Sequence, residues 1–364
     1  MKPNSHLERL KARLRELTSL NAISSVEKNV AQYMHDALKP LADEVSADNF
    51  GNVFALRRGK KPGPRLMIAP HSDEVGLMVR SITPDGFLKF HTIGAISSAI
   101  LPATRVIVDE KFHGTVATVA GHLEAEIQPR VRPVSELHID VGASSEKEVR
   151  SWGIREGTPV NFVSPLVELH NPELVMSKSI DNRIGCTILL DVFERMKGET
   201  FEGEIYGVVN VMEEMGLRGA RMATARVKPD WAIALDTIPS EDTPLSEERS
   251  CSIGKGPVLQ LIEGRAEAFI GSAMHPKVRD LILDTAKKEN IPVQFAAQYG
   301  KWVTDAAAIH ISGEGVPSAC LNIPRRYSHS PNEVMNLNDA VNASHLVLAL
   351  VKRNSAKLSF RIVE

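Results

Sequence analysis

Residues 209–220 read VNVMEEMGLRGA, and they join an element built for the protein interior to two adjacent carboxylates. The apolar run from Ile205 to Val211 is typical of a buried strand, and Glu213 and Glu214 come just after it. Burying one unpaired carboxylate is costly, and burying two neighbours costs more. Either the pair points to solvent, or a strongly positive group lies beside it.

Helices and strands alternate on both sides of this junction. Short apolar runs predict strands at residues 64–70, 204–211, 230–236, 292–297 and 318–324. Helical patterns occur at residues 181–197, 217–227, 275–290, 304–311 and 337–353. This alternation predicts an α/β sheet with helices on both faces.

The N-terminal part of the chain carries local signals of the same kind. Ser5 with Glu8, and Ser24 with Glu27, have the spacing of capping boxes and predict helices near 5–18 and 25–38. The sequence DNFGN, residues 48–52, predicts a hairpin turn.

The segment 76–165 has a different texture, with short β-rich runs, frequent turn signals and no convincing helical pattern. Strands at such intervals are typical of a small barrel or sandwich. The sequence therefore predicts an α/β domain formed by residues 1–75 and 166–364, interrupted by an all-β, barrel-like insertion at residues 76–165.

Composition excludes several classes of function. The 364 residues are 43% hydrophobic and carry a formal net charge of -2, which gives no basic surface for nucleic acid. No apolar run approaches the roughly 18 residues of a membrane span, and the N-terminus lacks a signal-peptide core. Cys186, Cys251 and Cys320 are odd in number and widely separated, which favours a reducing compartment. We expect a soluble cytoplasmic protein without nucleic-acid or membrane partners.

Histidine and carboxylate side chains follow several of the predicted strands or begin the next helix. In chain order these side chains are His71 with Asp73, Asp181, Glu213 with Glu214, Asp236, and His329. Each alone has an ordinary explanation, such as a solvated turn or a loop histidine. Because the carboxyl ends of strands in an open α/β sheet form one crevice, groups distant in sequence could converge there. Their joint occurrence predicts a site that binds divalent metal.

The motifs around these residues resemble those of a known family. HSDEVG, SIDNRIGC, EEMGLRGA, IALD and RRYSHSP are similar to motifs of the tetrahedral and glutamyl aminopeptidases, a family that includes FrvX-like proteins. The resemblance extends over nearly the whole chain. It implies a dinuclear metallopeptidase whose catalytic domain is interrupted by a β domain used for dimerisation. It also implies homo-oligomers, with dimers that can assemble into a tetrahedral dodecamer.

The resemblance also implies a role for each residue. Asp181 would bridge two metal ions, His71 and Asp236 would complete one site, and Glu214 and His329 the other. Mixed histidine and carboxylate ligands suit zinc or cobalt better than magnesium or calcium.

The two remaining acidic residues would serve the reaction. Asp73 would hydrogen-bond the His71 ring and fix its tautomer. Glu213 would act as general base on a water that bridges the metals, and the substrates would be short peptides cleaved after their first residue.

Some features depart from the family pattern or stay open. Asn182 stands where a second aspartate is usual, and Trp302 and Val303 replace small residues before TDA. Thr304 and Asp305 could line a substrate pocket or begin a helix. Arg326 and Tyr327 could line that pocket or pair locally.

Two other functions remain open. Paired carboxylates could hydrolyse a glycosidic bond without metal, as in an endoglucanase. Alternatively, the protein could be a metal-stabilised assembly partner without catalytic activity, although Glu213 argues against that reading.

Overall fold

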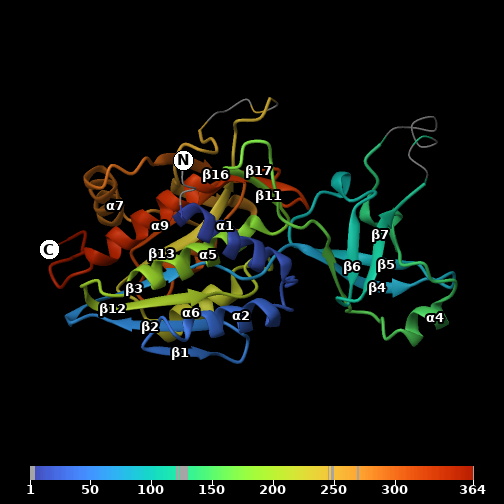
Figure 1. Cartoon of the computed structure of the whole chain (residues 1–364), viewed down its shortest axis with the longest axis horizontal. Helices are drawn as coiled ribbons and strands as arrows, with labels where there is room; N and C mark the ends of the chain where they lie inside the picture. Colours follow the sequence, from blue (N-terminus) through green and yellow to red (C-terminus); the bar gives the residue numbers. More distant parts are fainter. Residues whose placement is uncertain are drawn as a thin grey trace.

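The computed structural model describes residues 5–119, 122, 130–244, 246, 250–268 and 270–363. Figure 1 shows a large sheet covered by helices and, beside it, a smaller body made of β-strands. Among the described residues, no helix has both the length and the apolar character that a bilayer crossing requires.

Twelve strands form the large sheet within the described part of the chain. Nine of them lie side by side in the order β1 (Glu44–Ala47), β2 (Val53–Arg58), β12 (Glu202–Val209), β3 (Lys61–Ala69), β13 (Trp231–Pro239), β17 (Ser318–Arg326), β18 (Glu333–Asn336), β11 (Leu174–Ser177) and β10 (Val167–Glu168). The other three are β14 (Val258–Arg265), which pairs with β17, and its neighbours β15 (Ile270–Ala273) and β16 (Gln294–Tyr299). β12, β3, β13 and β17 are parallel, so their carboxyl ends lie at one edge of the sheet.

Helices cover both faces of this sheet, because successive side chains of a strand point to opposite sides. In β3, Leu66 and Ile68 pack into one apolar cluster, whereas Met67 and Ala69 pack into another. The first cluster includes α1 (Ser5–Ser19), α2 (Lys28–Leu38), α5 (Ile180–Arg195), α7 (Pro276–Lys288) and α9 (Leu337–Lys352). The second includes α6 (Arg218–Val227) and α8 (Asp305–His310). The predicted α/β sheet with helices on both faces is confirmed.

The smaller body in Figure 1 is a closed barrel with an apolar core. Its strands follow the order β4 (Gly76–Ile82), β5 (Leu88–Ile93), β8 (His138–Asp140), β7 (Phe112–Ala117), β6 (Arg105–Val108) and β9 (Pro159–Phe162). The chain enters this barrel after β3 and returns to the sheet at β10. The expectation that the segment contains no helix is wrong, since α4 (Glu146–Ser151) forms there, capped by Ser145, which accepts a hydrogen bond from Glu148 N.

The second predicted capping box is also wrong. α2 begins at Lys28, and the Glu27 side chain makes no cap bond to it. Instead the Ser24 hydroxyl donates to Asp73, and Glu27 accepts hydrogen bonds from Ser25 N and Met212 N. Long-range partners therefore use the groups that the local pattern assigned to the helix end.

Candidate metal centre

The five predicted metal ligands converge at the carboxyl ends of the parallel strands. His71 follows β3, Glu214 lies between β12 and α6, Asp236 is in β13, His329 follows β17, and Asp181 begins α5. In the described part of the chain they form two sets that could each hold a metal ion. Within each set the ligand atoms lie within 4.8 Å of one another.

Asp181 belongs to both sets, with one oxygen directed at each imidazole. His71 Nε2 lies 3.2 Å from Asp181 Oδ1 and 3.6 Å from Asp236 Oδ1. His329 Nε2 lies 3.3 Å from Asp181 Oδ2 and 3.3 Å from Glu214 Oε1. A shared carboxylate of this kind fits two cations held side by side.

The charges of this cluster do not balance within the chain. Asp181, Asp236 and Glu213 are buried together, and among the described residues Arg325 is the only lysine or arginine that ion-pairs with a ligand. Asp181 Oδ1 is buried and accepts no hydrogen bond from the described residues. An orphaned oxygen among histidine and carboxylate donors fits divalent transition metals.

Asp73 holds the loop that carries the paired glutamates. Its Oδ1 lies 3.3 Å from His71 Nδ1 and accepts from Glu213 N at 3.0 Å. Its Oδ2 accepts from Glu214 N at 3.1 Å and from the Ser24 hydroxyl. The residue therefore connects the loop to Ser24, which was not expected. It also lies beside the His71 ring, but the hydrogen bond that the sequence predicted is not formed, since His71 Nδ1 has no hydrogen-bond partner among the described residues.

Two charged residues of the site were not predicted. Arg325 is fully buried at the end of β17, where it pairs with Asp181 and lies 3.1 Å from Glu333. Glu333 in turn accepts from Asp181 N and His329 N, each at 3.0 Å. The signal was present in the segment RRYSHSPNE, where charged residues flank the predicted ligand His329 at both ends.

Electrostatic shifts show how far the site is from charge balance. Burial alone would lower the pKa of His71, but Asp181, Asp236 and Asp73 raise it well above its usual value. Burial raises the pKa of Glu213 well above its usual range; the charge of His71 opposes this shift, and the charges of Asp236 and Glu214 add to it. Bound cations would reverse both shifts, because metal ligation requires a neutral imidazole and favours charged carboxylates.

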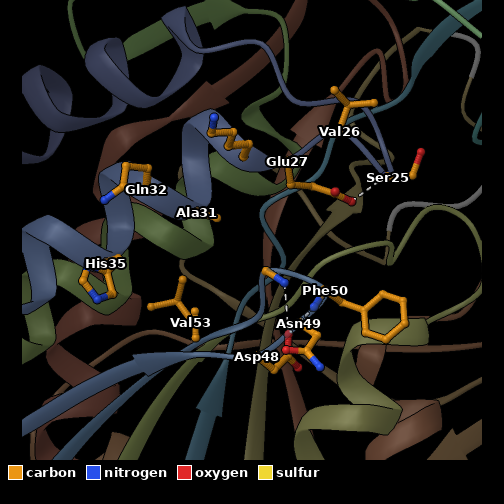
Figure 2. Close-up of a pocket in the computed structure, with 13 residues that line it drawn as sticks. Ser25, Val26, Glu27, Ala31, Gln32, His35, Asp48, Asn49, Phe50 and Val53 are labelled. Atoms are coloured by element: carbon orange, nitrogen blue, oxygen red, sulfur yellow. Dashed lines mark hydrogen bonds between the residues drawn. The ribbon is translucent and has the colours of Figure 1, made fainter.

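A cavity of about 240 Å³ opens onto the cluster. Beside the ligands it is lined by Thr237, Lys301, Trp302 and Thr304, among others. A second cavity of about 570 Å³ lies between α2 and the turn at residues 48–51 and shares no lining residue with the first (Figure 2). The site thus has room for a small substrate group next to the predicted ligands.

The structure places three of the four residues whose roles the sequence left open. Thr304 both lines the cavity and caps α8, since its hydroxyl accepts from Ala306 N. Asp305 is buried and accepts from Asn210, and burial raises its pKa to about 7. Arg326 pairs locally with Asp242 through two hydrogen bonds of 2.9 and 2.7 Å.

Several known proteins that are similar to this chain are named aminopeptidases. The family model described as M42 glutamyl aminopeptidase matches residues 51–346. The lysyl aminopeptidase of Pyrococcus furiosus is 34% identical over 87% of this chain and 89% of its own length.

Solved structures show the same fold. The aminopeptidase APDkam598 of Desulfurococcus kamchatkensis is 34% identical, covers 97% of both chains and has a TM-score of 0.91. The TET1 peptidase of Pyrococcus horikoshii, which can assemble into a tetrahedron or a large octahedral shell, is 26% identical with a TM-score of 0.83. That alignment covers 94% of this chain and 99% of the TET1 chain.

Proposed function

The chain belongs to the M42 glutamyl aminopeptidase family, a family of metal-dependent peptide hydrolases, and on this premise we propose how its site works. The protein removes the N-terminal residue of short peptides with two divalent cations and Glu213 as general base. The observation that carries the proposal is the pair of ligand sets that share Asp181. His71 and Asp236 complete one set, and Glu214 and His329 complete the other.

Two cations bound there would polarise the scissile carbonyl and lower the pKa of the attacking water. Zinc or cobalt suits the mixed histidine and carboxylate ligands better than an all-oxygen metal does. The chain's own groups then move the proton. Glu213 takes it from the water and delivers it to the leaving amine.

Asp73 fixes the geometry of this step. Its carboxylate lies 3.3 Å from the His71 ring and holds the amides of Glu213 and Glu214. Holding the general base in place matters because a small displacement of a catalytic group lowers the rate strongly.

We also propose that residues 76–165 form an inserted domain through which two copies of the chain pair, in a homo-oligomer that extends to a dodecamer. The tetrahedral and octahedral assemblies of the TET1 peptidase support the homo-oligomer. Val119 and Val131 are exposed in the connection between β7 and β8 and would supply apolar surface for such a contact. The proposed location is the cytoplasm, where Cys186, Cys251 and Cys320, which are all free and buried, would stay reduced.

Replacing the Glu213 carboxylate tests the mechanism. Glu213→Gln should lower kcat on aminoacyl-anilide substrates by roughly 10²–10⁴-fold, the usual contribution of a general base. The metal content, measured by inductively coupled plasma mass spectrometry, should stay at the wild-type value.

Glu204→Gln is the matched control, because it makes the same change in β12 at a residue that pairs with Arg65 away from the site. It should leave kcat unchanged. Full turnover by Glu213→Gln would remove Glu213 from the mechanism.

A further inference from the structure

Three successive backbone amides in the loop 212–214 donate hydrogen bonds to side-chain carboxylates. Met212 N donates to Glu27 Oε1 at 3.0 Å, while Glu213 N and Glu214 N donate to Asp73. Asp73 also lies against His71 and so belongs to the site already described. Glu27 comes from the start of α2, so a distant segment of the chain holds the first amide of the loop.

The loop needs external support because its conformation and its charges are both unfavourable. Met212 has a φ of 53°, a left-handed conformation that costs a non-glycine residue about 1 kcal/mol or more. The next residue, Glu213, is buried near the like charges of Glu214, Asp236 and Asp305. Both effects would move the loop away from the cluster if its backbone were free.

Glu27 occupies a position that its own helix does not explain. It is only 5% exposed, it makes no cap bond to α2, and no lysine, arginine or histidine of the described chain lies within the 4.0 Å of an ion pair. Burial and the charge of Asp73 raise its pKa to about 7. A buried carboxylate without a cation is costly, and its bonds to Ser25 N and Met212 N are what offset that cost.

Both of these bonds go to the same oxygen, Oε1, which lies 2.7 Å from Ser25 N. Ser25 also has a left-handed φ, of 75°. Figure 2 shows Glu27 extending toward Ser25 at the edge of the larger cavity. One oxygen thus connects two strained backbone positions, one before α2 and one in the catalytic loop.

We propose that Glu27 is a positioning residue for peptide hydrolysis, which holds the Met212 amide so that Glu213 and Glu214 stay directed at the metal cluster. The inference rests on the proposed function. It assigns the Glu27 side chain to the reaction through the loop, without contact with substrate.

Two substitutions separate the reach of this side chain from its charge. Glu27→Asp keeps the charge but is one methylene too short to reach Met212 N. We expect kcat to fall at least tenfold with KM within threefold. Isothermal titration with zinc should show at least tenfold weaker binding at the site that contains Glu214 and His329. Binding at the site that contains His71 and Asp236 should be unchanged. Glu27→Gln keeps an acceptor oxygen and should stay within threefold of wild type in both measurements.

Asp339→Asn is the matched control for a general loss of stability. Asp339 is also a buried carboxylate that accepts two backbone amides, from Gly254 and Gly256, and burial raises its pKa to about 7. This variant should melt at a lower temperature but keep kcat and both metals.

Wild-type kcat and metal binding in Glu27→Asp would overturn the proposal, as would equal losses in Glu27→Asp and Glu27→Gln. If the wild-type protein cleaves no peptide, the proposed function fails, and the zinc titration still decides whether Glu27 supports the Glu214 site.

Discussion

Asp73 and Glu74 are neighbours in sequence and both are buried, yet they belong to regions with opposite charge balance. Asp73 faces the side chains of the candidate metal site, where carboxylates outnumber the cationic groups that the chain supplies. Glu74 lies between Lys178, at 2.7 Å, and Arg183, at 3.2 Å. Burial would raise the pKa of Glu74, but these two cations hold it below its usual value.

The difference distinguishes a structural buried charge from a functional one. At Glu74 the chain supplies both signs, as a buried ion pair requires for stability. At the metal cluster the chain supplies an excess of one sign, so folding alone does not favour the arrangement. We infer that the deficit is made up by cations from outside.

Removing the metal should have the largest effect, because it affects only the candidate metal site and leaves the Glu74 ion pairs intact. Dialysis against a chelator should lower peptidase activity by more than about 10³-fold, because the cations both polarise the carbonyl and activate the water. It should also lower the melting temperature, since a ligand at 100 times its Kd stabilises the folded state by about 2.7 kcal/mol.

Activity on aminoacyl-anilides before chelation, after chelation and after return of zinc or cobalt measures the first effect. Hydrolysis of a glucan that survives the chelator would instead support the endoglucanase reading.

Removing a cation from the Glu74 region should give the next largest effect. Lys178→Met leaves Glu74 buried with Arg183 alone and should reduce the free energy of unfolding by about 3 kcal/mol at pH 7. Urea denaturation measures this loss. Lys39→Met, the same change at an exposed lysine after α2, should cost little.

The loss should depend on pH in a defined direction. In the wild-type protein the folded pKa of Glu74 is depressed, so the ion pair stabilises at neutral pH and is lost as pH falls through the folded pKa. In Lys178→Met burial dominates and the pKa of Glu74 rises, so this variant regains stability on acidification. The two proteins should therefore differ less at pH 4 than at pH 7, and a constant difference would contradict the assignment.

The sequence predicted which histidine and carboxylate side chains lie together, because each signal is local. His71, Glu214 and His329 each follow a recognisable strand, and Asp236 lies in the last half of β13, which continues to Pro239. Parallel strands end at one edge of the sheet. The alternation of helices and strands likewise predicted the helices on both faces of the sheet. The short β-rich runs between residues 76 and 165 predicted the barrel.

What could not be predicted depends on contacts between distant segments. Ser24 and Glu27 have the spacing of a capping box, but Ser24 hydrogen-bonds to Asp73 and Glu27 to Met212 N instead. Arg325 and Glu333 lie near His329 in sequence, yet their partner Asp181 is more than a hundred residues away. No periodicity or local spacing encodes such pairs.

Lys301 is a positive charge without a nearby carboxylate, the opposite of the carboxylate excess at the candidate metal site. Replacing it gives the smallest effect that we expect. It lines the cavity beside the cluster, lies 5.9 Å from the centre of the Trp302 ring, and has no carboxylate of the described chain within 4.0 Å. Glu241, whose pKa is influenced by this charge, bonds instead to Ser250 and Gln298. A substrate carboxylate in the cavity would be able to pair with this ammonium.

We therefore expect Lys301→Glu to lower kcat/KM for substrates with an acidic first residue by about tenfold, or about 1.4 kcal/mol, relative to those with a neutral one. A basic first residue should gain. Glutamyl-, leucyl- and lysyl-anilides measure the side chain of the first residue, whereas dipeptides with and without a C-terminal amide measure the terminal carboxylate. Lys28→Glu, the same charge reversal at the other cavity, should leave every ratio unchanged, and identical ratios in Lys301→Glu would show that this ammonium does not contact substrate.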